Sequence, residues 1–427
     1  MLAVLLCVAL GAMQARAATT QLARHGVLGV VPADQHGAVV VIAVRPASAA
    51  QQVGLKSGDA IVSLNAKPIA SSADLVARLH LPAGSRVTLG VRRNGKTIVR
   101  HVILKAAAKE TSPDFDIRYD AVAVEGTLRR TLITVPRTHG KHGAVLFIGG
   151  IGCYSIDNTP GDDPYRRLAY DLTRHGFVTM RLEKSGIGDS QGPPCATVDF
   201  TSEALSYARA LASLRQVPQV DLSRVYLFGH SIGTVIAPRI GIKSPVAGII
   251  AAEGVAINWF EYELINQRRQ LPLAGVAPAD VEPAMQRKEY CMHRLLIDKV
   301  AAARILRDRP ACAADLAYPV PDAYVRELAA LNLADPWLRV ATPTLAIYGT
   351  ADFETDVEDH ERIVRLVNAR HPGHAMLKII PQMDHYLTHA DSQQISFQRV
   401  LKNQAGAYDE DFSRAILQWL AAIKRSA

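Results

Sequence analysis

The sequence lacks the features that mark disordered, nucleic-acid-binding and zinc-binding chains. Its 427 residues contain no low-complexity tract and no long run of charge of one sign, which excludes disorder over most of the length. The net charge is +8, but Lys and Arg never gather into a basic cluster, so we expect no nucleic acid among the partners. There is no C-x-x-C pair and no histidine at ligand spacing from a cysteine pair, so we expect no metal.

Long apolar runs are also missing, and the one at the start is too short to span a bilayer. It reads MLAVLLCVALGAMQARA and ends in Ala15-Arg16-Ala17, which matches an A-x-A cleavage site. These features predict a signal peptide over residues 1–17 and a periplasmic or secreted protein that meets the membrane only through export. A buried N-terminal helix or a membrane anchor is the alternative. No Lys or Arg precedes the run, so a true start further upstream is also open.

Cysteine is scarce, and after cleavage at this site four would remain: Cys153, Cys195, Cys291 and Cys312. An even number in an exported protein predicts disulfides, since that compartment permits them. Four cysteines allow three pairings, and their number alone does not choose among them.

Length and patterning predict two domains. Short β-rich runs around one helix occupy residues 20–106, and a linker rich in Lys, Ala, Ser and Pro covers 107–117. Strands and helices alternate over 118–427, which predicts an α/β fold with a doubly wound, mostly parallel sheet. A long helical insertion at about 255–340 exceeds the length of a simple crossover and predicts a cap over the sheet.

The first domain resembles the PDZ family, most clearly in GLKSGDAIVSLNAKPI over residues 54–69. SSADLVARLHL over residues 71–81 predicts the helix that follows, with Ser72 as its N-cap. Val27-Leu28-Gly29-Val30 is similar to the PDZ carboxylate-binding loop, so the resemblance implies that Leu28, Gly29 and Val30 bind the C-terminus of a peptide. The alternative is a small β module that binds nothing.

The strongest chemical motif is Gly229-His230-Ser231-Ile232-Gly233, which fits G-x-S-x-G between an apolar strand and a helix. The motif requires a sharp strand-to-helix turn that exposes the serine hydroxyl, and this context predicts Ser231 as a nucleophile. A serine hydroxyl needs a histidine base, and the base needs a carboxylate that fixes its tautomer.

Both partners are expected after Ser231, in the order acid and then histidine. Asp352 directly follows an apolar strand, and His385 follows the next one, which favours this pair. Asp356 is an alternative acid. His389, one helical turn beyond His385, is an alternative base.

A tetrahedral intermediate also requires two backbone N–H donors directed at its oxyanion. One is expected at Ile232, directly after the nucleophile. The second is expected in the turn Gly149-Gly150-Ile151-Gly152, at Ile151 or Gly150.

With these motifs in order, the region from about residue 116 to the end resembles the α/β-hydrolase superfamily. Within it, the helical cap and RLEKSGIGDSQG over residues 181–192 are similar to the serine aminopeptidase-like and lysophospholipase-like branch. The resemblance implies no metal and no organic cofactor. It places Cys153 and Cys195 in adjacent loops at one edge of the sheet and Cys291 and Cys312 in the cap, which predicts these two pairs.

The sequence therefore predicts an exported serine hydrolase with a small-molecule ester as substrate. Trp259, Phe260 and Tyr262 offer the cap an apolar surface for an acyl chain, or else pack between cap and core. A peptidase is the alternative, with the PDZ-like domain recruiting polypeptides and Glu261 and Glu263 binding a substrate amine. A binding or scaffold protein without catalysis is a third reading.

Overall fold

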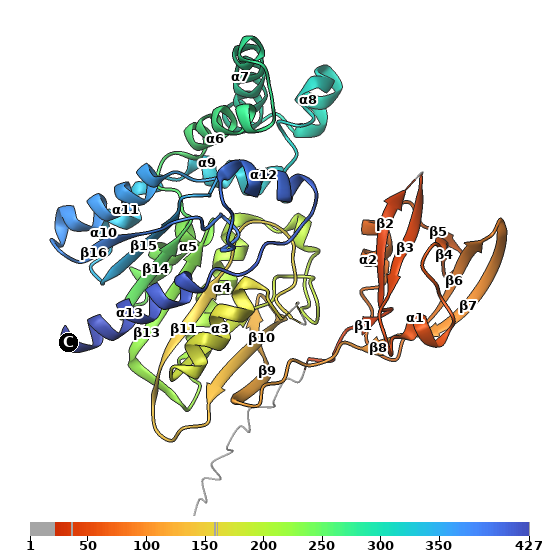
Figure 1. Ribbon diagram of the computed structural model, residues 1–427, viewed down its shortest axis with the longest axis horizontal. Coiled ribbons are helices and arrows are strands. Elements are labelled where there is room, and N and C mark those ends of the chain that lie inside the picture. The colour runs from red at the N-terminus through yellow and green to blue at the C-terminus, as the bar shows by residue number, and fades with distance from the viewer. Residues whose placement is uncertain (1–21, 36, 158, 160, 427) are drawn as a thin grey trace, which may run out of the picture.

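The protein forms a small β-rich domain and a large α/β domain joined at a narrow base (Figure 1). The computed structural model describes residues 22–35, 37–157, 159 and 161–426, so the predicted signal peptide lies outside the described residues. The base is an antiparallel pair, β1 (Gly26–Val27) with β8 (Lys105–Ala106). Within the described part, no helix is both long and apolar enough to cross a membrane.

The small domain is an antiparallel sheet with two short helices. Its strands follow the order β2 (Val30–Gln35), β3 (Ala38–Val44), β4 (Ala60–Leu64), β6 (Arg86–Arg93) and β7 (Lys96–Ile103), and β5 (Lys67–Pro68) pairs with β4. The helices are α1 (Ala49–Gln52) and α2 (Ser72–Arg78). Ser71, not Ser72, caps α2, because its Oγ accepts from the N–H of Asp74 at 3.1 Å. Leu75 on α2 packs with alternating strand residues such as Val39 and Leu89 to form the core.

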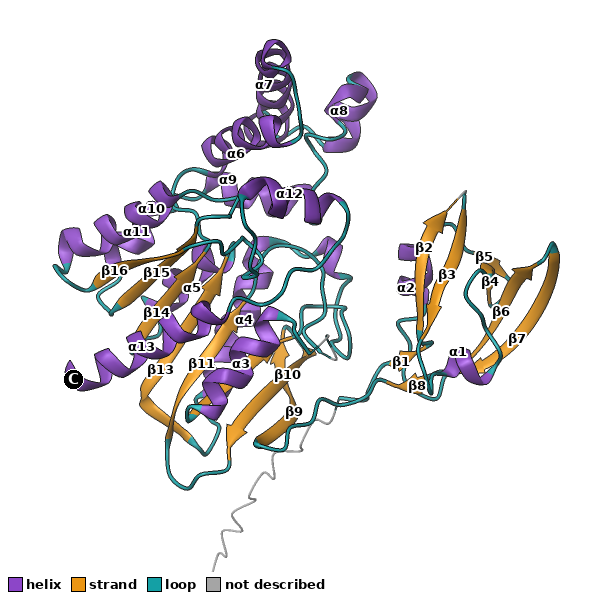
Figure 2. Cartoon of the chain, viewed as in Figure 1, coloured by secondary structure: helices purple, strands orange, loops and turns teal. Residues whose placement is uncertain are grey.

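The large domain is built on an eight-stranded sheet in which the central strands are parallel, as the sequence predicts (Figure 2). The strands are β9 (Phe115–Val124), β10 (Thr127–Pro136), β11 (His142–Ile148), β12 (Phe177–Leu182), β13 (Val220–His230), β14 (Gly248–Ala252), β15 (Thr344–Gly349) and β16 (Ala375–Ile380). Their order is β9-β10-β12-β11-β13-β14-β15-β16, and only β10 runs antiparallel to the other strands of this sheet. Every residue of β11, β12, β14 and β15 is buried, since helices cover both faces.

Helices pack on the two faces of this sheet in separate cores. α3 (Pro164–Arg174) and α13 (Glu410–Ser426) contribute to one core, and α4 (Phe200–Leu214), α5 (Gly233–Gly241) and α11 (Val357–Arg370) contribute to the other. Parallel strands all point their carboxyl ends to one edge of the sheet. Residues that follow different strands therefore meet there.

The insertion after β14 is helical, as expected. It contains α6 (Trp259–Leu273), α7 (Pro278–Met292), α8 (Ala302–Asp308), α9 (Asp322–Ala330) and α10 (Ala334–Arg339), with a π-helical turn at His293–Ile297 and a 3₁₀ turn at Pro310–Cys312. A second 3₁₀ turn lies at Cys195–Thr197, and α12 (Gln393–Leu401) follows β16. Trp259 and Tyr262 are buried in the core shared with the sheet, and Phe260 packs against it, which agrees with the packing interpretation.

Two disulfides join the cysteine pairs that the sequence predicts. Cys153 pairs with Cys195, and Cys291 pairs with Cys312, each with 5.7 Å between the two Cα atoms. The second bridge ties α7 to the 3₁₀ turn within the cap.

Candidate active site

Ser231 occupies a sharp turn between β13 and α5, and its φ of +53° lies in the left-handed region. Its N–H donates to the carbonyl of Ala252 at 3.0 Å, which fixes the turn to the neighbouring strand. Gly233 is required by close packing, because a Cβ there would lie 2.1 Å from the carbonyl oxygen of Ile148. The G-x-S-x-G sequence thus produces a strained turn that presents the serine hydroxyl at the carboxyl edge of the sheet.

The hydroxyl of Ser231 lies in hydrogen-bonding distance of His385, which is bound in turn to Asp352. The distance from Ser231 Oγ to His385 Nε2 is 3.1 Å, and that from His385 Nδ1 to Asp352 Oδ2 is 2.9 Å. A carboxylate can only accept, so Nδ1 of His385 carries the hydrogen and Nε2 is free to accept the serine proton. Asp352 is fully buried and His385 is nearly so. The arrangement is that of a nucleophile, a base and an orienting acid.

The two alternative residues lie elsewhere. Asp356 caps α11, where its side chain accepts from the N–H of Glu358, and it pairs with Arg269 at 2.9 Å. The ring of His389 is half exposed and lies 3.5 Å from Asp391. Neither has a hydrogen bond to Ser231 or His385 among the described residues, so the geometry favours Asp352 and His385.

Charges around His385 favour its protonated form. Burial lowers the pKa of His385, but the carboxylates of Glu354 and Asp352 outweigh this and raise it to about 9. Burial by itself would raise the pKa of Asp352, yet the charge of His385 and several hydrogen bonds hold it well below its ordinary value. Asp352 thus remains ionised opposite the histidine. Glu354, whose Oε2 lies 3.5 Å from His385 Nε2, was not anticipated from the sequence.

The loop after β11, residues 149–157, contains the turn predicted to supply the second oxyanion donor and is called the oxyanion loop; it lies against Ser231. A methyl group added at Gly150 would be 3.4 Å from the Cβ of Ser231. The N–H of Gly150 already donates to the hydroxyl of Tyr165 at 3.0 Å. Of the two residues predicted for the second donor, Ile151 is therefore the one that remains available, alongside Ile232 at the N-terminus of α5.

Tyr165 and His230 link the oxyanion loop to the loop after β16 that carries His385. The hydroxyl of Tyr165 lies 2.6 Å from His230 Nδ1, and His230 Nε2 lies 2.7 Å from the carbonyl oxygen of His385. That oxygen can only accept, so Nε2 of His230 donates and Nδ1 accepts from the tyrosine. Burial, together with the charge of His385, lowers the pKa of His230 to about 3, which keeps this ring neutral. Sequence reasoning did not assign a role to either residue, although His230 is the x of G-x-S-x-G.

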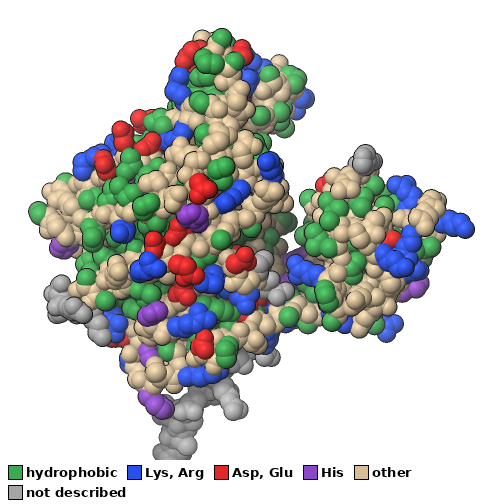
Figure 3. All heavy atoms as spheres, in the orientation of Figure 1, with side chains coloured by type: hydrophobic (Ala, Val, Ile, Leu, Met, Phe, Trp, Pro, Cys, Tyr) green, Lys and Arg blue, Asp and Glu red, His purple; other side chains and the backbone are tan. Residues whose placement is uncertain are grey.

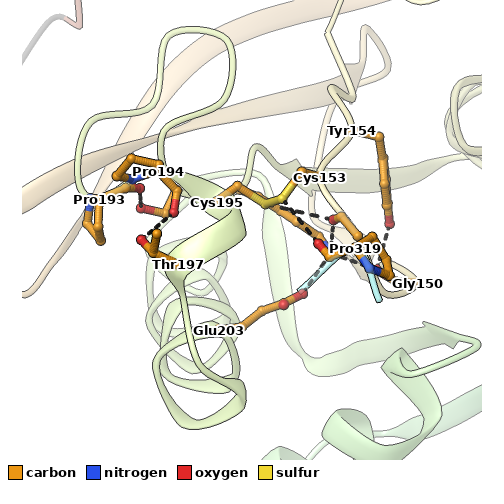
Figure 4. The surroundings of a disulfide bond; sticks show 12 residues. Gly150, Cys153, Tyr154, Pro193, Pro194, Cys195, Thr197, Glu203 and Pro319 are labelled. Atoms are coloured by element: carbon orange, nitrogen blue, oxygen red, sulfur yellow. Dashed lines mark hydrogen bonds and ion pairs between the residues drawn. A yellow bond between two sulfur atoms is a disulfide. The ribbon is translucent and has the colours of Figure 1, made fainter. Parts of the chain in front are cut away.

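Lys184 and a disulfide both fix the oxyanion loop. Nζ of Lys184 donates to the carbonyls of Gly150 and Gly152 at 2.7 and 2.8 Å. Figure 4 shows the bridge from Cys153 in this loop to Cys195. Lys184 belongs to the RLEKSGIGDSQG segment, which carries part of the family resemblance in the sequence. These contacts fix the carbonyls of the loop and, with them, the direction of its N–H groups.

A cavity of about 780 Å³ opens onto Ser231 and His385, within the usual size of a small-ligand site. Its walls come from the oxyanion loop, the start of α3, α12 with the segment after it, and the loops after β15 and β16. From the insertion, Pro319 contributes. Besides His230 and His385, the charged and aromatic lining residues are Tyr154, Asp162, Asp163, Tyr165, Glu354, Asp384, Tyr386 and Arg399. The cap aromatics considered for an acyl chain do not line this cavity.

The residues of the predicted peptide site lie at the start of β2, an edge strand of the small sheet. Leu28 is buried, and Gly29 has a φ of +83°. The carbonyl of Leu28 accepts from Ala50 and that of Gly29 accepts from Arg45, at 2.8 and 2.9 Å. Among the described residues, β2 pairs with β3 alone in this sheet, so its other edge is the position at which an added peptide strand would pair.

Positive charge is concentrated in the small domain. Residues 22–107 contain 11 Lys and Arg, three Asp and no Glu, so they account for the whole net charge of +8. Figure 3 shows Lys and Arg side chains on the end of this domain that lies away from the large domain. The small domain therefore favours a negatively charged ligand.

The base of the small domain contacts the large domain through ion pairs. Arg24 Nη1 lies 2.5 Å from Asp157 and 2.6 Å from Asp189, and His25 Nδ1 lies 2.6 Å from the same Asp189. Asp157 lies in the oxyanion loop, four residues after Cys153. The segment just before Leu28 is thus anchored beside the loop that borders the nucleophile.

The chain matches two protein-family models, each over one of these domains. The PDZ domain model matches residues 26–104, and the model of the alpha/beta hydrolase family matches residues 145–395, more than half of the chain. The chain therefore belongs to the alpha/beta hydrolase family and carries a PDZ domain in front of the hydrolase domain. Neither model distinguishes the aminopeptidase-like branch from others.

Individual relatives divide in the same way. Esterase EstD of Thermotoga maritima is 23% identical over 291 residues, which cover 67% of this chain and 64% of that esterase, less than two thirds. Periplasmic serine endoprotease DegP of Salmonella typhimurium is 43% identical over 76 residues, 18% of this chain and 16% of the protease. Among solved structures, Est1E from Butyrivibrio proteoclasticus is 11% identical, with 71% of this chain and 99% of that one covered and a TM-score of 0.43.

Proposed function

We propose that the protein is an exported serine esterase that cleaves a carboxylic ester through an acyl-enzyme on Ser231. The observation that carries this proposal is the hydrogen-bonded series from Ser231 through His385 to Asp352 at the wall of a cavity. The similarity to an esterase across the hydrolase domain supports an ester rather than an amide.

In the proposed reaction, Ser231 Oγ attacks the ester carbonyl carbon while His385 Nε2 takes its proton. The N–H groups of Ile232 and Ile151 stabilise the oxyanion. The tetrahedral intermediate then expels the alcohol, which receives the proton from His385 and leaves an acyl-enzyme. Water attacks this ester in the same way and releases the acid. Asp352 holds the tautomer of His385 throughout and stabilises its charge.

A peptidase is the second candidate, and two observations favour it. The PDZ domain resembles part of a periplasmic endoprotease, and Asp162, Asp163 and Glu354 give the cavity an acidic wall suited to a substrate amine. The two cap acids that the sequence suggested for binding an amine do not fill this role. Glu263 is buried in an ion pair with Lys288 at 2.8 Å, and neither it nor Glu261 lines the cavity.

We further propose that the PDZ domain recruits partners by their C-termini, with Leu28, Gly29 and Val30 binding the carboxylate. The concentration of positive charge in this domain supports acidic C-terminal segments as its ligands. A periplasmic or secreted location is supported by the A-x-A site and by the pairing of all four cysteines after it. A non-catalytic scaffold is the least supported reading, because it leaves the serine, histidine and acid geometry without a purpose.

The test combines covalent labelling with a substrate series on the purified mature protein. A fluorophosphonate should label Ser231, and p-nitrophenyl esters of graded chain length should be cleaved in preference to aminoacyl amides. Ser231→Ala should abolish labelling and lower kcat by about 10³-fold or more while the protein stays folded. Ser206→Ala, which changes a helix serine of α4 outside the site, is the matched control.

Two outcomes contradict the proposal. Labelling of another residue in an active sample would refute the nucleophile. Turnover of aminoacyl amides without turnover of any ester would replace the esterase by the peptidase.

A further inference from the structure

Glu253 is a buried acid for which the proposed mechanism has no role. It follows β14 directly, its side chain has no solvent exposure, and its φ of +48° is unusual for a residue with a side chain. Burying a carboxyl group is costly unless it is hydrogen-bonded. A glutamate in a strained backbone position at the carboxyl edge of the sheet therefore needs specific partners.

Its partners lie around Asp352. Glu253 Oε1 accepts from the N–H of Gly349 at 2.7 Å, and Oε2 is 3.5 Å from Thr355 Oγ1. The same hydroxyl of Thr355 donates to Asp352 Oδ2 at 2.5 Å. One oxygen or nitrogen atom from each of Glu253, Asp352 and His385 lies within 4.8 Å of the others.

The residue at 349 has to be glycine for this arrangement to exist. A Cβ at Gly349 would lie 2.9 Å from Glu253 Oε1 and 2.2 Å from the carbonyl oxygen of Met383. The glycine at the end of β15, three residues before Asp352, thus leaves room for the side chain of Glu253.

The charge state of Glu253 follows from its neighbours. Burial raises the pKa of Glu253 well above its ordinary value, and the charge of Asp352 raises it further. The titratable groups that act on it or lie beside it are Tyr348, Asp352, Asp384 and His385. His360 accepts from the N–H of the next residue, Gly254, at 2.9 Å. Two adjacent carboxylates rarely both ionise, and Asp352 has the histidine as a partner, so Glu253 keeps the proton.

The hydrogen bonds of Thr355 also indicate that Glu253 is protonated. A threonine hydroxyl has one hydrogen, and here it is directed at Asp352. A hydrogen bond between Thr355 Oγ1 and Glu253 Oε2 then requires Glu253 to donate its own hydrogen to the threonine oxygen. A neutral carboxylic acid has such a hydrogen, whereas a carboxylate does not.

We propose that Glu253 is a positioning residue for Asp352: its neutral carboxyl group and the hydroxyl of Thr355 form a hydrogen-bonded support that holds Asp352 against His385. Glu253 does not contact substrate. The inference rests on the proposed function of Asp352 and His385. Glu253 and Thr355 thus extend the hydrogen-bonded series that runs from Ser231 through His385 to Asp352.

The test uses Glu253→Gln and Glu253→Leu in the full-length protein with a small ester as substrate. Gln keeps a hydrogen-bond donor and an acceptor, so kcat should remain within about threefold of the wild type. Leu removes both, so kcat should fall at least tenfold while KM changes less than twofold, because substrate binding is untouched. Adding Glu253→Leu to Asp352→Asn should cost little more than Asp352→Asn alone, because both act on one unit.

Thr355→Val covers the case in which Glu253→Leu does not fold. It removes the hydroxyl with almost no change of shape and should lower kcat with KM unchanged. Thr179→Val is the matched control, since Thr179 is equally buried but bonds to Thr134 on the neighbouring strand. Folding of each variant is checked by circular dichroism.

The outcomes separate the two levels of inference. If Asp352→Asn impairs kcat but neither Glu253→Leu nor Thr355→Val does so in a folded protein, the support role is refuted and the proposed function stands. If Glu253→Gln is as impaired as Glu253→Leu, a neutral donor is not what Asp352 needs, and the inference fails. If Asp352→Asn has no effect, the proposed function fails with it.

Discussion

The Glu354→Gln substitution should move the acidic limb of the pH profile of kcat/KM to lower pH. Glu354 is the acid nearest to the free nitrogen of His385, with Oε2 3.5 Å from Nε2. Its negative charge stabilises the protonated imidazole, which cannot accept the proton of Ser231. Removing the charge lowers the pKa of His385, so the active, unprotonated form appears at lower pH.

The size of this displacement follows from the distance. Two unit charges 3.5 Å apart interact by about 1 kcal/mol in water and by about 5 kcal/mol at an effective dielectric constant near 20. The side chain of Glu354 is 26% exposed, which places the pair toward the weaker end. A change of one in pKa corresponds to about 1.4 kcal/mol, so we expect the acidic limb to move by about 1–2 on the pH scale. The hydroxyl of Tyr386 donates to Glu354 Oε1 at 2.6 Å, and the amide oxygen of Gln can still accept it.

The assay is kcat/KM for a small ester between pH 5 and pH 10. In the wild type, the pKa of His385, raised to about 9, puts the rise of activity on the alkaline side. If the limb moves by one on the pH scale, the variant should be about tenfold more active than the wild type at pH 7. Glu361→Gln on α11 is the control, because Glu361 faces Arg365 on its own helix. An unchanged limb in Glu354→Gln, or an equal displacement in the control, would refute the electrostatic assignment.

Three further results are expected. His385→Ala should abolish ester hydrolysis while His389→Ala leaves it within about threefold, and the reverse pattern in folded proteins would replace the base. Peptide mapping without reductant should find Cys153 bonded to Cys195, and replacing both by Ser should lower the free energy of unfolding by about 2–4 kcal/mol; free thiols in the purified protein would contradict this. Replacing residues 28–104 by a short Gly-Ser loop keeps the ion pairs at the base of the PDZ domain and should preserve small-ester turnover. A deletion that also removes this base should reduce turnover, and equal loss in both folded variants would mean that the PDZ body itself shapes the active site.

Much of the fold was predictable because the sequence patterns are local. Continuous apolar runs such as residues 144–148 predict strands buried on both faces, and the strand and helix flanking Ser231 predict its turn. The PDZ segment is recognised by residues close together in sequence. In each case the deciding interactions lie within about 20 residues of chain, which is the range that a pattern can report.

The supports of the site were not predictable in this way. Glu253, Glu354 and His230 act on groups that are between about 30 and 155 residues away in sequence, and no spacing rule connects them. Glu253 reads as an ordinary acid after a strand, although it is fully buried beside Asp352. The acidic cavity wall likewise combines the start of α3 with the loop after β15.

The sequence by itself determined two domains, a doubly wound, mostly parallel sheet in the second domain, and the residue types at the ends of three strands. The sequence favours Asp352 and His385 and leaves Asp356 and His389 as alternatives. The tertiary structure adds that, among the described residues, Asp352 bonds to His385 and His385 lies in hydrogen-bonding distance of Ser231. It also shows that the N–H of Gly150 is bonded to Tyr165 from α3, which favours Ile151 as the second of the predicted donors. The physical reason is that parallel strands bring distant loops to one edge, where direction, burial and charge depend on neighbours that the chain does not place next to one another.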